Sequence, residues 1–203
     1  MRLVEGNKRM TKQRILAKAL ELFTEKGYEG SSMDDIAKAV GIRKASLYAH
    51  FDGKERIFAA IFDDILEEYT RVIDQLTACS EEPAVERLTQ LYLSFIDYCI
   101  DNQKMYFWDR YFYYPPAFWK DFIREKTLET ETLFLARIRW WMQRAMTEAA
   151  HDKCDAEGMA LAYYYSMIGL SMSVKLYDRK PLLEEAQAAL RGLCLGMQRG
   201  CVP

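Results

Sequence analysis

The chain has 203 residues, half of them hydrophobic, and a formal net charge of −2. This length and composition suit one large or two modest globular domains with a real core, and they exclude a disordered chain. The first 60 residues hold 12 Lys or Arg against 8 Asp or Glu, a net of +4, so the remainder carries −6. A basic N-terminal domain before an acidic remainder is compatible with an anionic partner such as DNA.

Two amphipathic helices are predicted near the start of the chain. Apolar residues recur at helical spacing over residues 15–23, and Gly27 is expected to end this first helix. Ser32 offers a hydroxyl to free backbone amides, and Asp35 follows three positions later. This pair forms a variant capping box, with Asp in place of the usual Glu, and it predicts a second helix over residues 33–40.

A third helix of about two turns is predicted over Lys44–His50. Leu47 and Phe51 are four positions apart and can face inward, which leaves Lys, Ser, Tyr and His side chains on the other faces. Short hydroxyl and basic side chains of this kind reach base edges in the major groove, while Tyr and Lys donors reach phosphates. Lys54, in the first turn of the next helix, opposes the helix dipole and would be favoured by an anionic partner.

Residues 41–55, GIRKASLYAHFDGKE, resemble the DNA-binding region of the TetR family of transcriptional regulators. That family shows a Gly-Val-Ser-x-x-x-Leu-Tyr-x-(His/Tyr)-Phe-x-x-Lys-(Glu/Asp) run after a (Thr/Ser)-x-x-x-Ile-Ala helix. The resemblance implies an all-α homodimer, usually a repressor, that is released from its operator by a small molecule. It implies a helix-turn-helix DNA-binding domain at residues 1–55 and a ligand-binding and dimerisation domain at residues 56–203. The positions that it places at DNA are Ser32, Lys44, Ser46, Tyr48, His50 and Lys54.

Arg43 departs from the family pattern, which has Ser or Thr as the helix cap at this position. Losing the cap would cost about 0.5–2 kcal/mol, yet an arginine could reach phosphate or guanine, so we add Arg43 to the predicted DNA contacts. Ser46 and His50 have the spacing of a nucleophile and base, but no orienting carboxylate is evident, and no enzyme is predicted. The alternative is a helical module that binds a small molecule or a protein without reading DNA.

The rest of the chain keeps a helical pattern. In the last predicted helix, about Leu182 to Gln198, apolar residues follow a 3,4,3,4 spacing that suits either core packing or an interface. Because the resemblance places a dimer-forming four-helix bundle here, we predict a dimer interface. Its residues are Leu183, Ala186, Leu190, Leu193 and Met197. The preceding segment has 17 uncharged residues between Glu157 and Lys175, fewer than the roughly 20 that a membrane span needs.

Nine of the fifteen residues from Met105 to Trp119 are aromatic. Such density fills a core or lines a cavity for a bulky ligand, and the sequence favours neither use for any one ring. A cationic ligand would gain from aromatic faces and from the carboxylate of Asp109. We predict an effector that is bulky and hydrophobic or aromatic, or cationic. Its predicted contacts are Trp108, Tyr111, Phe112, Trp141 and Tyr164.

Five scattered cysteines without paired spacing indicate reduced, mostly buried thiols in a cytoplasmic protein. The start MRLVEGNKRM lacks an apolar signal core, so secretion is not expected. The acidic, His and Cys residues within 151–155 lack a recognisable metal-ligand spacing, so neither a metal nor another cofactor is predicted. The expected partners are a double-stranded DNA operator, a small-molecule effector and a second copy of the chain, with no membrane.

Overall fold

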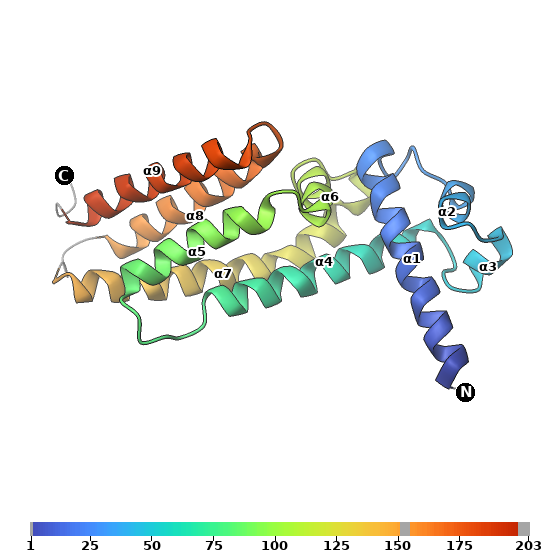
Figure 1. Cartoon of the computed structure of the whole chain (residues 1–203), viewed down its shortest axis with the longest axis horizontal. Coiled ribbons are helices and arrows are strands. Elements are labelled where there is room, and N and C mark those ends of the chain that lie inside the picture. The colour runs from blue at the N-terminus through green and yellow to red at the C-terminus, as the bar shows by residue number, and fades with distance from the viewer. Residues whose placement is uncertain (1, 151–154, 199–203) are drawn as a thin grey trace. The chain divides into compact units, whose positions relative to one another are not determined.

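The computed structural model describes residues 2–150 and 155–198, with only the backbone described for residues 2–5, 7 and 194–198. Within this part every regular element is a helix (Figure 1), so the predicted all-α class is confirmed. The elements are α1 (Arg2–Lys26), α2 (Met33–Val40), α3 (Lys44–Tyr48), α4 (Lys54–Leu76), α5 (Ala84–Cys99), α6 (Gln103–Tyr113), η1 (Ala117–Trp119), α7 (Lys120–Glu148), α8 (Ala156–Met172), η2 (Ser173–Lys175) and α9 (Arg179–Gln198).

The chain folds into two compact units. The N-terminal unit contains the residues up to Glu68 together with Gln103–Lys120, and the C-terminal unit contains Tyr69–Asn102 and the residues from Asp121 onward. Helix α4 begins in the first unit and ends in the second. The division by function after residue 55 remains a prediction. By packing, residues 56–68 and 103–120 belong with the predicted helix-turn-helix.

An aromatic cluster forms the core of the N-terminal unit. The ring of Phe58 is fully buried and lies 4.4 Å from Trp119, 4.9 Å from Tyr111 and 5.3 Å from Phe107, measured between ring centroids. Buried aromatic side chains of this size dominate the energetics of a small core. The cluster therefore joins α4, α6 and η1 into one body with the end of α1.

Helix α6 caps the C-terminus of α1. The hydroxyl of Tyr111 donates to the carbonyl oxygen of Phe23 at 2.9 Å, and burial raises the pKa of this phenol to about 12. Arg110 donates to the carbonyl oxygen of Thr24 at 3.0 Å. Gly27 follows with φ of 80°, and a Cβ there would lie 2.8 Å from a terminal nitrogen of Arg110. Glycine is therefore favoured at this helix end by its backbone conformation, and a larger residue would also displace the end of the Arg110 side chain.

The C-terminal unit packs α9 against α5 and α8. Leu182 and Ala186 are fully buried on α9, and Leu190 is 5% exposed. Helix α9 begins at Arg179, three residues earlier than predicted, because Pro181 lies in the first turn, where the missing N–H has no helical partner to lose. Between α5 and α8, the hydroxyl of Tyr163 donates to the carbonyl oxygen of Leu88 at 2.6 Å.

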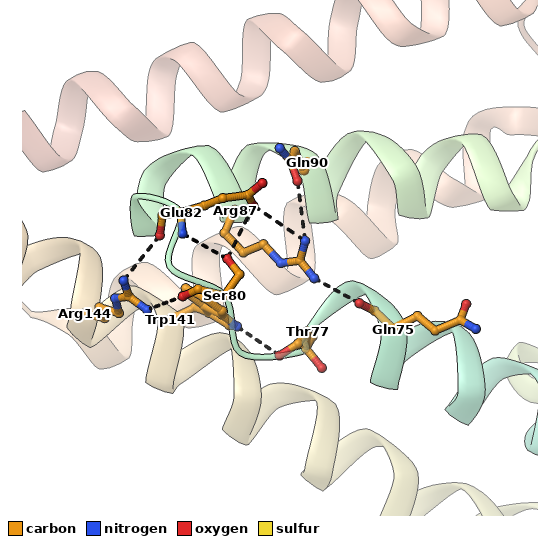
Figure 2. A network of polar contacts seen from close by, with 8 residues as sticks. All are labelled: Gln75, Thr77, Ser80, Glu82, Arg87, Gln90, Trp141 and Arg144. Atoms are coloured by element: carbon orange, nitrogen blue, oxygen red, sulfur yellow. Dashed lines mark hydrogen bonds and ion pairs between the residues drawn. The ribbon is translucent and has the colours of Figure 1, made fainter.

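Polar contacts from α7 and α5 fix the loop between α4 and α5 (Figure 2). Arg144 donates to the carbonyl oxygens of Ser80 and Glu82 at 3.0 and 3.3 Å, and the indole of Trp141 donates to that of Thr77 at 3.2 Å. Arg87 donates to the carbonyl oxygen of Gln75 at 2.9 Å. One carbonyl group of the last turn of α4 and three of the following loop therefore accept hydrogen bonds from side chains.

No helix in the described part of the chain is long and apolar enough to cross a membrane. Two cysteines are described at the level of side chains: Cys99 is buried and Cys79 is exposed, so the expectation of mostly buried thiols stays a prediction for the set of five. The side chains of Cys154, Cys194 and Cys201 lie outside the described residues, as do His151 and Asp152.

Candidate nucleic-acid interface

Helix α2 begins with the predicted capping box. The amide of Asp35 donates to the hydroxyl of Ser32 at 3.1 Å, and the amide of Ser32 donates to the carboxylate of Asp35 at 3.0 Å. Hydrogen bonds from Ser32 hold the pKa of the Asp35 carboxyl below its usual value. At the other end of α2, Arg14 donates to the carbonyl oxygen of Val40 at 2.8 Å. Ser32 is exposed, and its hydroxyl is also engaged in this local cap.

Helix α3 has a buried side and an exposed side, as its spacing predicts. Leu47 is fully buried and Phe51 is 6% exposed, whereas Tyr48 is 44% exposed. Lys44 and Ser46 are also exposed. A short helix anchored by two apolar residues can therefore present a lysine, a hydroxyl and a phenol to a partner. The structure places these three predicted DNA contacts together on the outside of the N-terminal unit.

Helix α3 is shorter than predicted and ends at Tyr48. The amide of His50 donates to the carbonyl oxygen of Leu47 at 2.9 Å, three residues back, so the chain tightens into a turn. His50 is half-buried in this turn rather than exposed on the helix. Its predicted contact with DNA remains a prediction, and it has less surface available than its neighbours on α3.

Arg43 precedes α3 in an extended conformation, with φ of −72° and ψ of 146°. No side-chain hydrogen bond caps the helix from this position within the described structure, so the loss of a cap predicted from the sequence is confirmed. The arginine side chain is exposed. It therefore adds a positive charge at the N-terminus of α3 in place of a structural contact.

Lys44, one of the two lysines in the predicted DNA set, forms an exposed ion pair. The ammonium group of Lys44 lies 3.0 Å from a carboxylate oxygen of Asp34 on α2, and this hydrogen bond raises the pKa of Lys44. Both side chains are 54% exposed, so a phosphate could compete for the lysine in water. The pair also ties α3 to the first turn of α2.

Lys54 holds the turn between α1 and α2. Its ammonium group donates to the carbonyl oxygens of Tyr28 and Ser31 at 2.7 and 2.9 Å and lies 4.1 Å from the centroid of the Tyr28 ring. Two of its three N–H donors are thus engaged, and a phosphate contact would depend on the third. Sequence reasoning missed this role because Lys54 and Tyr28 are 26 positions apart, so no local pattern links them.

Residues 15–61 match the family model described as bacterial regulatory proteins, tetR family. The N-terminal domain of this chain belongs to the TetR family. A segment of 47 residues is 57% identical to IcaR of Staphylococcus aureus, named as the negative transcriptional regulator of the biofilm operon icaADBC. The match covers 23% of this chain and 25% of IcaR, and the IcaR of Staphylococcus epidermidis is 55% identical over a segment of the same length.

Solved structures extend the likeness beyond this domain at the level of fold. A TetR transcriptional regulator from Chloroflexus aurantiacus superimposes with a TM-score of 0.71 and 22% identity over 98% of both chains. MexZ of Pseudomonas aeruginosa, named as a key repressor responsible for antibiotic resistance, gives a TM-score of 0.72 with 18% identity over 94% of this chain and 96% of its own. The C-terminal unit therefore has the helical fold found in TetR-family structures.

The five predicted effector contacts are divided between the two units. Trp108, Tyr111 and Phe112 belong to the N-terminal unit, whereas Trp141 and Tyr164 belong to the C-terminal unit. Trp108 stacks on Phe112 at 5.2 Å between ring centroids, and Tyr111 is 2% exposed, as expected of core residues. Four of the nine aromatic side chains in residues 105–119 are buried in the core, namely Phe107, Trp108, Tyr111 and Trp119.

A groove in the C-terminal unit contains only one of these five residues, Trp141. Its volume of about 590 Å³ is comparable with that of small-molecule binding sites. Trp140 in its wall is 50% exposed, and Arg137 forms an ion pair with Asp74 and donates to the Thr77 hydroxyl at 2.9 Å. The lining residues are Asp74, Thr77, Ala78, Cys79, Arg137, Trp140 and Trp141.

The predicted dimer residues divide by burial. Ala186 and Leu190 are buried within the chain and keep little surface for a partner, whereas Leu183 and Leu193 are partly exposed. The side chain of Met197 lies outside the described residues. The sequence did not indicate the exposed apolar side chains of the preceding segment. These are Tyr165 at 64%, Met172 at 41%, Leu176 at 80% and Tyr177 at 53% exposure.

Proposed function

We propose that this chain is a homodimeric, DNA-binding transcriptional regulator that represses by occupying an operator. The main support for the proposal is that α3 has a buried side and an exposed side. It buries Leu47 and exposes Lys44, Ser46 and Tyr48. A helix of this kind fits the major groove, where hydroxyl and basic side chains contact base edges and phosphates. Repression is supported by the matched segment of IcaR, which is named as a negative regulator.

A dimer is required because one five-residue helix reads only a half-site. Two recognition helices about 34–36 Å apart would enter successive major grooves of a palindromic operator. The exposed apolar side chains of Tyr165, Met172 and Leu176 support a second copy as the partner that covers this side of α8 and η2. Leu183 and Leu193 on α9 have surface left to join the same interface.

The effector that we propose is a bulky aromatic cation bound in the groove beside Trp140. An exposed indole offers a face for stacking and for cation–π attraction. The side chain of Asp74 is 50% exposed at the same groove, and a cationic effector would share its carboxylate with Arg137. An effector that binds the free dimer more tightly than the DNA-bound dimer would release the operator, and this difference in affinity is the only requirement.

Selection of duplexes from a random pool, followed by titration of the selected sequence, tests the reading of DNA. We expect the wild type to enrich a palindromic sequence, and Lys44→Ala and Tyr48→Ala each to weaken its binding by about ten-fold, as loss of a phosphate or base contact does. Lys180→Ala, an exposed lysine of α9, is the matched control and should bind as the wild type does. Equal binding to all duplexes, or unchanged affinity of both α3 variants, would contradict the proposal.

A pair of probes with one shape and opposite charges tests the effector class. Tetraphenylphosphonium should bind the protein, quench tryptophan fluorescence and lower affinity for the selected duplex. Tetraphenylborate should bind more weakly, because the exposed face of Trp140 attracts a cation and not an anion. Trp140→Ala should lose this binding, and Phe118→Ala, another exposed aromatic residue, should retain it. Equal binding of the phosphonium ion to Trp140→Ala would exclude this groove as the effector site.

A further inference from the structure

The N-terminal half of α1 is a cationic helix outside the segment that matches the TetR family. Residues 6–14 include four Lys or Arg and no Asp or Glu. Lys8, Arg9 and Lys12 are exposed, and the first buried side chain in the described part of the helix is Ile15. In Figure 1 this half of α1 extends beyond α2 and α3. Among residues 8–14, Met10 is the one large apolar side chain and it is 61% exposed, so this segment buries no apolar side chain against the rest of the N-terminal unit.

A helix of this composition gains little stability by itself. Helices that are polar on all sides depend on side-chain pairs or on a partner, and like charges four positions apart, such as Lys8 and Lys12, repel one another. No ion pair of Lys8, Arg9 or Lys12 occurs among the residues that the structure describes. An adjacent polyanion would attract both lysines and offset their mutual repulsion. An anionic surface is therefore a suitable partner for this segment.

Two contacts place the cationic helix beside the recognition elements. The guanidinium group of Arg14 is bonded to the carbonyl oxygen of Val40, the last residue of α2. The ammonium group of Lys12 lies 5.4 Å from the centroid of the Phe51 ring, just after α3. Lys8 lies one helical turn beyond Lys12, on the same side of α1. The positive charge is therefore continuous with the surface that α3 presents.

We propose that Lys8, Arg9 and Lys12 bind the phosphate backbone of duplex DNA just outside the operator half-site. The inference rests on the proposed function and extends it, because these contacts add affinity and salt dependence without reading sequence. A membrane surface fits less well, because an interfacial helix needs an apolar side to insert and residues 6–14 contain one large apolar side chain, Met10. The partner is thus the DNA that flanks the bases contacted by α3.

The test removes the three charges and compares two lengths of DNA. The variant Lys8→Gln/Arg9→Gln/Lys12→Gln keeps Arg14, so the contact with α2 is unchanged. Its matched control, Arg71→Gln/Lys120→Gln/Arg124→Gln, loses the same charge from exposed positions elsewhere. The probe is the duplex selected by the wild type, either trimmed to the half-sites or extended by about one helical turn on each side. Circular dichroism and thermal melting verify that both variants are folded.

On the extended duplex, we expect the α1 variant to bind at least about ten-fold more weakly than the wild type in roughly 0.15 M salt. The slope of log affinity against log salt should fall by about 0.9 for each phosphate that the variant no longer neutralises. On the trimmed duplex the variant should match the wild type, and the control should do so on both. Sequence preference should not change in the variant.

Several outcomes would overturn the inference. A selected duplex that the α1 variant binds with wild-type affinity and salt slope at both lengths would exclude the flanking contacts and leave the proposed function intact. Loss of binding to phosphatidylserine vesicles with unchanged binding to DNA would identify a membrane as the partner instead. Failure of the wild type to select any sequence would refute the proposed function itself.

Discussion

Helices α3 and α6 of the N-terminal unit are both short and both rich in side chains suited to binding, yet the fold uses them in opposite ways. Helix α3 buries Leu47 and leaves Lys44 and Tyr48 exposed. Helix α6 buries Phe107 fully and Tyr111 almost fully. Polar donors gain nothing by burial without partners and so stay available, whereas aromatic rings gain free energy by leaving water. A row of donors is thus better evidence for a site than a row of rings.

The largest effect that separates these helices is on stability. Phe107→Ala should destabilise the protein by about 3–5 kcal/mol, because it removes a fully buried ring and leaves a cavity. Tyr48→Ala should have a much smaller effect on the free energy of unfolding, about 0.5 kcal/mol, because the ring is 44% exposed and lies outside the core. Urea unfolding followed by circular dichroism measures both variants.

Phe118→Ala provides the control for aromatic content, since this side chain of η1 is 74% exposed and its loss should leave stability nearly unchanged. A small loss of stability for Phe107→Ala would show that α6 is not part of the core. In that case its rings would again be candidates for lining an effector site.

The sequence predicts those structural features that depend on residues a few positions apart in the chain. The capping box of Ser32 and Asp35 and the buried side of α3 are both confirmed, because each depends on spacings of three or four positions. The sequence does not predict which rings meet across the fold. Trp108 and Trp141 belong to different units, and the clamp formed by Lys54 joins residues 26 positions apart. Periodicity shows that a ring is buried but not which surface it contacts.

The second contrast lies between two lysines of the predicted DNA set. Lys54→Met should cost about 1–3 kcal/mol of stability, because the carbonyl oxygens of Tyr28 and Ser31 lose a charged donor. Lys44→Met should leave the urea midpoint unchanged within error, because its ion pair with Asp34 is exposed. Both substitutions should weaken binding to the selected duplex, Lys44→Met by loss of a direct contact and Lys54→Met by loosening the turn.

Titration of the selected duplex at several temperatures separates these two causes. Lys54→Met should recover DNA affinity at low temperature, where the folded turn is more populated, and Lys44→Met should not. Equal loss of affinity at every temperature, without loss of stability, would mean that Lys54 acts through a phosphate rather than through Tyr28 and Ser31.

The smallest effect concerns the cap of α3. Arg43→Ser restores a hydroxyl at the N-cap and should stabilise the protein by about 0.5–2 kcal/mol, because an N–H of the first turn gains an acceptor. Arg43→Ala provides no cap and separates this gain from the loss of charge. If Arg43 contacts DNA, both variants should bind the selected duplex more weakly although only the serine variant is more stable. If the serine variant binds as tightly as the wild type, Arg43 makes no contact with DNA. Recognition then depends on Lys44, Ser46 and Tyr48.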